Sequence, residues 1–548
     1  MDVRARTAPI DLPRGPRRDD EWTVTITRLG DKGEGVAAVD VRIGPDRRER
    51  RYTVHIRGAL PGESVTGRIV GRHRRSLDAR LIAIDEPIAT RIEPTCVHFG
   101  DTRQPGRGCG GCSLQNLAHP AQLDAKHAMV SKLLADRGLD VQLVKPTTAA
   151  SPTWHYRNKM ELSFGNDRDR QFSLGLHPAG YRYETLALSE CRLMSPFASA
   201  FVPALASWAQ DAGYRAFDPR KRDDNAGFLR TLTLREGKRT GQHMAVIETE
   251  ASVETPAAFG SSFVAAAHRI AADLDGSFDS VWWIQRDAER GKKTTYTSHH
   301  LAGTEMLREQ LHLPGGRRLL FDIAPRAFFQ PSTLGAEAIY AETLRQTGLA
   351  DGSTDTVLDL YCGTGTIGMC LSPWAKRVIG IDLSADAIAS AHANADLNGI
   401  DNVELHCGDT GKVLTDLGLG AGGIDVIVVD PPRAGLQGAA LDQVVALAPK
   451  RLVYVACRPS SLARDASLLR EKGYELKVVQ PIDQFPHTGH VECVATLDRT
   501  TLPQNPLRIR KEPQKQAVGV NGDGGSRGKD RSGEGSLSPT EIRVSHRP

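Results

Sequence analysis

The feature that most constrains the fold is a regular alternation of strand-like apolar runs and helical segments over residues 319–502. Such alternation is typical of a parallel, doubly wound α/β sheet with helices on its faces. Within it, VLDLYCGTGTIGM (357–369) predicts a buried strand, a glycine-rich turn and the start of a helix. Because open sheets of this class bind ligands where their strands end, this turn is the first candidate for a binding site.

The glycine-rich turn alone leaves two ligand classes open. Gly363, Gly365 and Gly368 satisfy G-x-G-x-x-G, and glycines let a ligand approach the backbone closely. The next strand ends in VIGIDLS, which places Asp382 to accept hydrogen bonds from ribose hydroxyls. Nicotinamide dinucleotides and S-adenosylmethionine are both bound with such an acid. A dehydrogenase and a methyltransferase therefore both remain possible at this point.

Two further acids separate these alternatives. Asp409 follows a third strand in VELHCGD, and Asp430 ends a fourth in DVIVVDPPRAGL. The carboxyl ends of parallel strands meet at one edge of the sheet, so we expect these acids to line one site with Asp382. Acids at the third and fourth strand ends suit the adenine of S-adenosylmethionine, and a dehydrogenase has no need of a rigid D-P-P-R turn. Each acid alone fits a turn or a helix cap, but their order favours a methyltransferase.

The remaining sequence predicts four further segments. Residues 1–19 are rich in Arg and Pro, and residues 503–548 in Gly, Ser, Pro and charge, so we expect both to be disordered. Residues 20–87 contain short alternating runs between glycine turns, which predict a five-stranded barrel of the OB type. Residues 88–318 mix a helical stretch (121–137) with strand-like pieces and predict an α+β central domain.

The predicted barrel is unusually basic. A run of charge is most often a solvated surface, but this density on a small barrel favours RNA binding. The net charge of +4 permits nucleic acid binding without demanding it. The first twenty residues contain no apolar signal, and no run reaches the length of a membrane span, so we expect a cytoplasmic protein without membrane contact. We also expect it to be a monomer. The basic residues are Arg47, Arg48, Arg50, Arg51, Arg68, Arg72, His73, Arg74 and Arg75.

The cysteines of the first half form a pattern of their own. Nine cysteines in 548 residues do not make a disulfide framework. Cys96, Cys109 and Cys112 give C-x12-C-x2-C, and Cys191 follows in LSECRLM. Three clustered cysteines and a distant fourth suit an iron–sulfur cluster or zinc. C-G-G-C also occurs in redox pairs, but no thioredoxin-like pattern surrounds it, and His98 is an alternative ligand to Cys96.

The motifs taken in order resemble the bacterial uridine C5 RNA methyltransferases. The resemblance is carried by F-F-Q-P-S, D-L-Y-C-G-T-G-T, D-P-P-R-A-G-L, Y-V-A-C-R-P-S-S-L-A-R-D and H-V-E. It covers nearly the whole chain, since that family also has an N-terminal TRAM barrel and, in one branch, an iron–sulfur cluster. It implies a class I, Rossmann-like methyltransferase domain over 319–502. It also implies that S-adenosylmethionine is bound by Gln330, Tyr361, Thr366, Asp382, Asp409 and Asp430.

The resemblance assigns the chemistry to two residues. Cys457, in VACRPSSLARD, matches the family's nucleophile, and Glu492, in GHVECV, its general base. A thiolate that adds to C6 of uracil makes C5 nucleophilic, and a base must then remove the C5 proton so that the cysteine can leave. The uridine must leave its stack to reach them. Arg458 offers a means of lowering the thiol pKa, but the family usually has Asn-Pro after the nucleophile where this chain has Arg458-Pro459. Cys362, Cys370, Cys407 and Cys493 are interpreted as packing residues.

The resemblance also indicates the substrate. Phe328 matches the aromatic residue expected against the target base, and Arg157 and Lys159 match a segment that faces RNA. It implies a [4Fe–4S] cluster on Cys96, Cys109, Cys112 and Cys191, with zinc as the alternative occupant. These cysteines and the basic barrel favour 23S rRNA over tRNA as the substrate. The alternatives are a tRNA enzyme, and a cluster-bearing RNA-binding protein with weakened or lost catalysis, which only the Arg458 departure supports.

Overall fold

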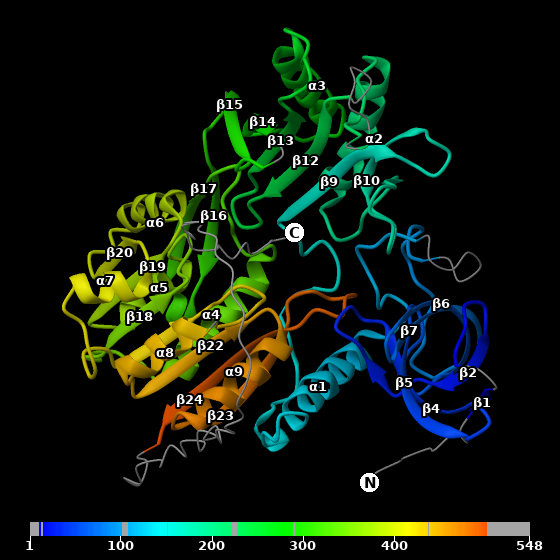
Figure 1. The fold of residues 1–548 in the computed structure, drawn as a ribbon. Helices are drawn as coiled ribbons and strands as arrows, with labels where there is room; N and C mark the ends of the chain where they lie inside the picture. Colours follow the sequence, from blue (N-terminus) through cyan, green and yellow to red (C-terminus); the bar gives the residue numbers. More distant parts are fainter. Residues whose placement is uncertain are drawn as a thin grey trace, which may run out of the picture. The chain divides into compact units, whose positions relative to one another are not determined.

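The computed structural model describes residues 10–12, 15–100, 108–150, 152–218, 220, 227–288, 291–436 and 438–500. Residues 1–501 form one compact unit, whose described strands make sheets of seven, seven, two and eight strands (Figure 1). The predicted disorder of residues 503–548 lies outside the described residues. Within those ranges, no helix is both long and apolar enough to cross a membrane.

The N-terminal sheet has the strand order β1-β4-β5-β7-β6-β2, with β3 paired to β4. Its apolar side chains form a core cluster of their own, because alternate residues of each strand point to the same buried face. The prediction of disorder over residues 1–19 is wrong at β1, whose backbone pairs in parallel with β4. The strands are β1 (Ile10–Leu12), β2 (Glu21–Thr25), β3 (Arg28–Leu29), β4 (Gly35–Ile43), β5 (Arg48–Ile56), β6 (Ser64–His73) and β7 (Ser76–Glu86).

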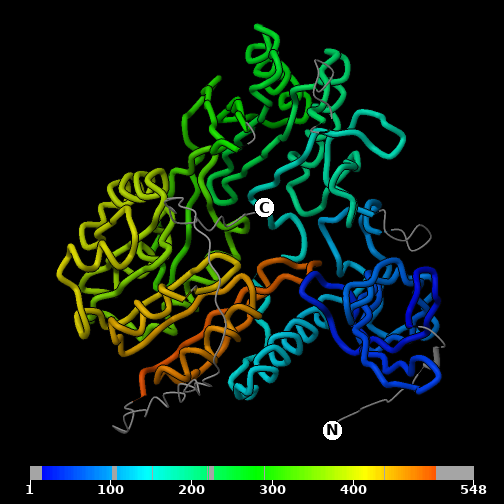
Figure 2. The backbone as a smooth tube through the Cα atoms, in the orientation of Figure 1, coloured from blue at the N-terminus to red at the C-terminus, as the bar shows by residue number. Residues whose placement is uncertain are grey.

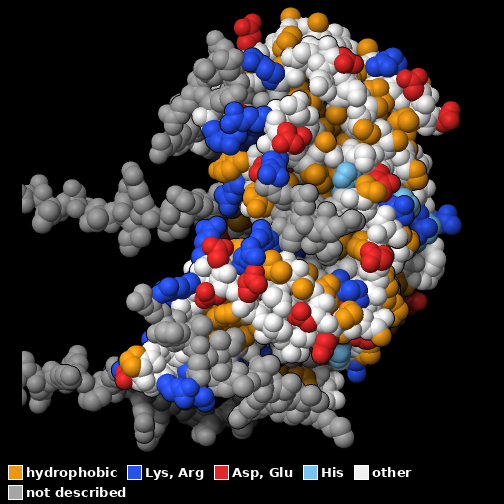
Figure 3. All heavy atoms as spheres, turned by 90° about the vertical axis from the view of Figure 1, so that its right-hand side faces the viewer, with side chains coloured by type: hydrophobic (Ala, Val, Ile, Leu, Met, Phe, Trp, Pro, Cys, Tyr) orange, Lys and Arg blue, Asp and Glu red, His pale blue; other side chains and the backbone are white. Residues whose placement is uncertain are grey.

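Some of the arginines of this sheet are paired with acids of the same sheet. The guanidinium of Arg68 lies 2.6 Å from Glu21, and that of Arg51 lies 3.8 Å from Asp40. On the face of the molecule drawn in Figure 3, Lys and Arg side chains likewise lie in several groups with Asp and Glu between them. The charge available to a nucleic acid is therefore smaller than the count of arginines indicates.

The central sheet has the order β11-β10-β9-β12-β13-β14-β15 and packs against two helices. Phe201 of α2 and Phe259 and Phe263 of α3 are fully buried in its core. A separate hairpin of β16 (Leu307–His312) and β17 (Arg318–Ile323) follows. The elements are β9 (Lys159–Asn166), β10 (Phe172–Leu176), β11 (Leu186–Ala187), α2 (Pro196–Asp211), β12 (Leu229–Glu236), β13 (His243–Glu250), α3 (Phe259–Asp273), β14 (Ser280–Asp287) and β15 (Thr295–Gly303).

Part of the region 88–318 belongs to the C-terminal sheet instead of the central one. Helix α1 (His119–Ala135) buries Met129, Val130 and Leu134 in the same core as strands of the C-terminal sheet (Figure 1). Strand β8 (Thr148–Ala149) pairs with the edge of that sheet. The predicted domain boundary at 318 is therefore wrong for these two elements, because the apolar face of α1 is buried against the C-terminal sheet.

The C-terminal sheet has the order β20-β19-β18-β21-β22-β24-β23-β8, with β18 to β22 parallel and β24 antiparallel to both of its neighbours. The order reverses between β18 and β21, which is where such sheets bind ligands. The elements are α4 (Thr333–Thr347), β18 (Thr356–Leu360), α5 (Thr366–Leu371), β19 (Arg377–Asp382), α6 (Ala385–Leu397), β20 (Val403–Cys407), α7 (Thr410–Asp416), β21 (Val426–Val429), α8 (Gly438–Leu447), β22 (Arg451–Ala456), α9 (Pro459–Glu471), β23 (Tyr474–Asp483) and β24 (Glu492–Arg499). Short 3₁₀ turns lie at Val141–Leu143, Pro314–Gly316 and Ser372–Trp374.

Candidate active site

The turn between β18 and α5 forms the floor of a ligand site. Gly363 and Gly365 have φ of 54° and 73°, and Tyr361 shares this left-handed conformation at 63°. Two acids hold the turn: the carboxylate of Asp359 accepts a hydrogen bond from the Gly368 N–H at 2.8 Å, and that of Asp382 accepts one from Gly363 at 3.0 Å. Sequence reasoning missed Asp359, although an acid inside an apolar strand is a usable signal. Its burial raises its pKa to about 8.

A pocket of about 1080 Å³ opens at the carboxyl ends of the parallel strands. This volume lies at the upper end for small-molecule sites, which leaves room for more than one ligand. Eight of the residues predicted to bind or react with a ligand line this one pocket, together with Gly363 of the glycine-rich turn. The eight are Arg157, Phe328, Gln330, Tyr361, Asp382, Asp430, Cys457 and Glu492.

Three other predicted residues are outside the pocket lining. Thr366 is buried at the start of α5, with its hydroxyl 3.1 Å from that of Thr364, which does line the pocket. Asp409 caps α7, where its carboxylate accepts a hydrogen bond from the Lys412 N–H at 3.2 Å. Lys159 lies 3.7 Å from Glu161 on the central sheet.

Cys457 and Glu492 are brought together by strand pairing. Cys457 directly follows β22, and Glu492 is the first residue of β24. The antiparallel register joins Val455 to Val494 and Ala456 to Cys493, so the next position along the ladder sets Cys457 opposite Glu492. Directly opposed residues of such a pair have their Cβ atoms about 4.5–5.5 Å apart. A thiol and a carboxyl that are distant in the sequence thus share one wall of the pocket.

Three acidic groups that line the pocket have raised pKa values. Burial raises the pKa of Asp430 to about 7. Burial and the neighbouring Asp430 raise the pKa of Glu492 to about 8, against the lowering effect of Arg433. Burial, Glu492 and Asp430 raise the pKa of Cys457 to about 11, again opposed by Arg433. A cationic ligand in this pocket would lower all three values, because it favours the charged forms.

The prediction that Arg458 lowers the thiol pKa is wrong. Its guanidinium lies 3.6 Å from Asp31, outside the pocket lining, and the cation that acts on Cys457 is Arg433 of the D-P-P-R motif. The physical reason is that the Arg458 side chain extends to Asp31, an anion of the loop between β3 and β4, whereas Arg433 lines the pocket beside the thiol.

The matches to known proteins agree with this site. Residues 290–500 match the family model described as tRNA (Uracil-5-)-methyltransferase. An uncharacterised RNA methyltransferase of Protochlamydia amoebophila is 34% identical over 453 residues, which cover 81% of this chain and 99% of that protein. A second, from Caldanaerobacter subterraneus subsp. tengcongensis, is 32% identical and covers 87% of this chain and 98% of that protein. The chain belongs to the RNA (uracil-C5) methyltransferase family.

The fold comparison extends over most of the methyltransferase. The solved tRNA (uracil-54, C5)-methyltransferase of Pyrococcus abyssi, in complex with S-adenosyl-L-homocysteine, superposes with a TM-score of 0.64 and 23% identity. The superposition covers 87% of this chain and 100% of the Pyrococcus abyssi chain. The C-terminal sheet is therefore a class I methyltransferase domain, and the family's methyl donor is S-adenosylmethionine.

Around the predicted residues Phe328 and Arg157, the pocket lining also contains Arg433, Phe485 and His490, which sequence reasoning missed. Phe328 projects from the rim with 67% of its surface exposed. The guanidinium of Arg157 lies over the ring of Phe485 at 5.4 Å, and Arg433 lies 3.5 Å from the ring nitrogen Nδ1 of His490. His490 could have been found from the sequence, because it lies two residues before Glu492 in the H-V-E motif.

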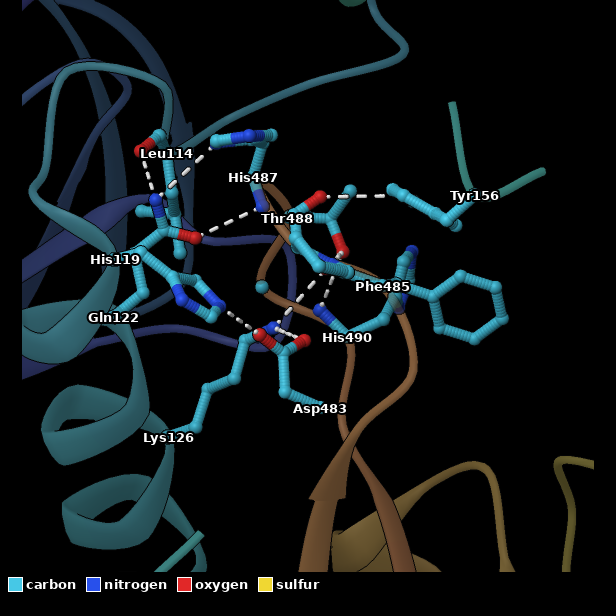
Figure 4. A network of polar contacts seen from close by, with 12 residues as sticks. Leu114, His119, Gln122, Lys126, Tyr156, Asp483, Phe485, His487, Thr488 and His490 are labelled. Atoms are coloured by element: carbon cyan, nitrogen blue, oxygen red, sulfur yellow. Dashed lines mark hydrogen bonds and ion pairs between the residues drawn. The ribbon is translucent and has the colours of Figure 1, made fainter. Parts of the chain in front are cut away.

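The loop that precedes Glu492 is fixed by a buried polar network (Figure 4). Lys126 of α1 donates to Asp483 at 2.5 Å and to the Phe485 carbonyl at 3.1 Å, and His119 lies 3.0 Å from the same carboxylate. Gln122 accepts a hydrogen bond from the His487 N–H at 2.8 Å. The general-base candidate therefore begins a strand whose preceding loop is tied to α1, and not a freely moving segment.

The four cysteines of the first half also converge. Cys96, Cys109, Cys112 and Cys191 line one small cavity of about 20 Å³ together with His98, and none forms a disulfide. Burial raises the pKa of Cys109 to about 11 and that of Cys112 to about 12, and the other cysteines add to this. Among the described residues, no group of three or more His, Cys, Asp or Glu side chains is arranged to hold a metal ion. Four thiols are the kind of donor that iron–sulfur clusters and structural zinc use, but these four are not in ligating geometry.

Proposed function

We propose that this enzyme methylates C5 of a uridine in 23S rRNA, with Cys457 as nucleophile and Glu492 as general base. The observation that carries the proposal is the placement of these two side chains across one β-ladder, in a pocket that Asp382 and Asp430 also line. A pocket with several buried carboxyls suits a ligand with a sulfonium cation, because the opposite charge compensates their desolvation.

The chain's residues would act in this order. The Cys457 thiolate adds to C6 of the uracil, and the electron pair moves to the C4 oxygen to give an enolate. C5 of the enolate attacks the methyl group of the donor, whose S–CH₃ bond breaks with its electrons left on sulfur. Glu492 then removes the C5 proton, and the C6–S bond breaks so that Cys457 leaves as a thiolate. Arg433, which lowers the pKa of both groups, supports their ionised forms.

Six residues are proposed to hold the methyl donor, in two roles. Gln330, Tyr361, Asp382 and Asp430 line the pocket and are proposed as direct contacts. Thr366 and Asp409 are proposed to shape the turn and the start of α7 that border it.

RNA is proposed to reach the pocket over its aromatic and basic rim. Phe328 is proposed to stack on the target base, since an exposed ring is a sequence-tolerant platform for bases. Arg157 and Lys159 are proposed to contact the backbone, and the N-terminal sheet over residues 20–87 to act as a TRAM-type RNA-binding domain. We further propose that the enzyme works as a monomer.

The four cysteines are proposed to hold a [4Fe–4S] cluster, with zinc as the alternative. Support comes from their convergence on one cavity and from the burial that disfavours free thiolates there, a cost that a bound metal offsets. Methyl transfer by this route needs no electron donor, so a structural role is proposed for the cluster. Iron and acid-labile sulfide contents of the anaerobically purified enzyme, compared between wild type and Cys112→Ser, test this assignment.

The decisive experiment offers purified enzyme and methyl-labelled S-adenosylmethionine to unmodified 23S rRNA and unmodified tRNA in parallel. The proposal expects 5-methyluridine in the rRNA, absent with Cys457→Ala. Label in the tRNA alone would overturn the substrate and leave the mechanism standing. Label in neither RNA, with the donor still bound, would favour an RNA-binding protein with weakened catalysis.

A further inference from the structure

We propose that Arg458 binds the 5′-phosphate of the target uridine, and that Asp31 is the intramolecular anion for which this phosphate is exchanged. The proposal rests on the proposed function, because it takes Cys457 as the residue that attacks the uridine. It concerns the arginine that directly follows the nucleophile, to which the reaction steps give no role.

The chemistry of the adduct places a phosphate near this arginine. In a nucleotide in the usual anti conformation, the C6 edge of uracil faces the C5′ carbon and the 5′-phosphate. A bond from Cys457 to C6 therefore brings that phosphate toward the immediate chain neighbours of the cysteine. Arg458 is the N-cap residue of the 13-residue helix α9, and its side chain makes no capping hydrogen bond. The planar guanidinium matches a phosphate, and the helix N-terminus favours an anion beside it.

The present partner of Arg458 is an anion, the carboxylate of Asp31. Its Nη2 lies 3.6 Å from Oδ2 of Asp31, which is longer than a hydrogen bond, and both side chains are 51% exposed. Exposed pairs of this kind contribute little to stability. The carboxylate can therefore be replaced at small cost by a phosphate that accepts two hydrogen bonds from the guanidinium.

The loop that carries Asp31 has hydrogen bonds that do not involve Arg458: the Gly33 N–H donates to the Gly30 carbonyl at 2.9 Å, and the Gly30 N–H to the Glu34 carbonyl at 2.7 Å. Gly33 has φ of 77°, and a Cβ there would lie 2.2 Å from the Ser113 hydroxyl and 3.1 Å from the Gly489 nitrogen. Gly489 in turn donates a hydrogen bond to the Ser113 hydroxyl at 3.2 Å. Figure 2 shows this close approach of two backbone segments, where the segment before β24 reaches the N-terminal sheet. The ion pair is therefore not required to clamp this loop, which leaves Arg458 available for exchange.

This arrangement predicts opposite effects for the two partners. If Arg458 binds phosphate, its loss weakens RNA binding, whereas loss of the competing Asp31 carboxylate strengthens it. If the ion pair instead holds the loop in place, loss of either Arg458 or Asp31 weakens RNA binding. The sign of the Asp31 effect thus separates the two roles.

The test measures binding of an unmodified 23S rRNA transcript at several salt concentrations, together with KM and kcat for 5-methyluridine formation. For Arg458→Asn we expect Kd and KM to rise about tenfold, kcat to stay within about twofold, and the slope of log Kd against log salt to fall by about 0.7–0.9, the loss of one phosphate contact. Arg458→Lys should keep the slope, because it keeps the charge. Asp31→Asn should lower Kd about two- to threefold in the wild-type background and have no effect in Arg458→Asn.

The controls are Arg269→Asn and Asp273→Asn, a somewhat more exposed pair on α3 with a 3.7 Å separation, for which no change is expected. A rise of Kd in Asp31→Asn, or an unchanged salt slope in Arg458→Asn, would overturn the proposal. If the wild-type enzyme binds the transcript but does not methylate it, the proposed function fails, whereas the slope comparison still decides the role of Arg458.

Discussion

The pocket that contains Cys457 and the cavity lined by Cys96, Cys109, Cys112 and Cys191 differ in what surrounds their thiols. In both, burial is the first cause of a raised cysteine pKa. The first opens into about 1080 Å³ and contains Arg433 and Glu492, whereas the second encloses about 20 Å³ and contains further cysteines. A shifted pKa therefore does not separate a reactive thiol from a structural one. The two thiol sites are distinguished instead by access for a substrate and by the charge of the neighbouring side chains.

The largest expected effect comes from removing the proposed nucleophile. Cys457→Ala should lower kcat at least about 10⁴-fold, because no other group can form the C6 adduct. Cys407→Ala, which removes an exposed cysteine of the same domain, is the matched control and should leave the rate unchanged. Methyl transfer and donor binding are measured on both variants. Activity near that of wild type in Cys457→Ala would contradict the distinction between a reactive thiol in the large pocket and structural thiols in the small cavity.

Removing the proposed base should lower kcat less than removing the nucleophile does, and it should leave a detectable covalent intermediate. Glu492→Gln should lower kcat about 10²–10³-fold, since proton removal by a positioned base contributes on this scale. Because elimination of Cys457 needs loss of the C5 proton, the variant should accumulate a covalent RNA–protein adduct on denaturing gels. Glu475→Gln, an exposed carboxylate on β23, serves as control. Absence of the adduct despite a slow rate would assign the proton to another group.

The pH dependence tests whether the raised pKa values belong to working groups. Cys457 and Glu492 act in their deprotonated forms, and their pKa values in the free enzyme are about 11 and about 8. We therefore expect kcat/KM to rise at least about tenfold per pH unit from pH 6 toward pH 8. A profile that is flat or that falls over this range would show that neither group controls the rate.

The buried network behind Glu492 should matter for stability. Lys126→Met should lower the free energy of unfolding by about 3–5 kcal/mol, because it leaves Asp483 buried without one of its partners. Burial raises the pKa of Asp483, but hydrogen bonds from His119 and Lys126 outweigh this and lower it. The stabilisation is thus complete above the ordinary carboxyl pKa and lost as pH falls through the lowered one. Denaturant titration against the exposed pair variant Lys132→Met checks this, and equal losses in both would contradict it.

The smallest effect on the reaction is expected at the cysteine cavity. Cys112→Ser should lower the thermal midpoint and any bound iron but reduce kcat less than about tenfold, because the cavity admits no substrate. Rates and melting curves are compared with those of Cys457→Ala. A loss of kcat as large as that of Cys457→Ala, in a folded variant, would show that the two thiol sites are not functionally separate.

Much of the catalytic domain could be predicted from its pattern. The parallel strands and the glycine turn followed the alternation of apolar runs, and Asp382 and Asp430 lie at strand ends as expected. The contact of Arg458 with Asp31 could not be predicted, because adjacency in sequence does not fix where a long side chain points. Helix α1 was assigned to the central domain instead of the C-terminal sheet, because the pattern of apolar residues in a helix does not specify which sheet they will cover.

The sequence by itself determined the class of the domain and the chemical groups available, because strand and helix periods and motif spacing are local properties. Only the tertiary structure decided which of those groups meet. The β22–β24 register sets Cys457 opposite Glu492, the D-P-P-R turn brings Arg433 to both, and Asp31 of the loop between β3 and β4 reaches Arg458. These are contacts between residues far apart in the chain, and they depend on strand order and packing that no local pattern specifies.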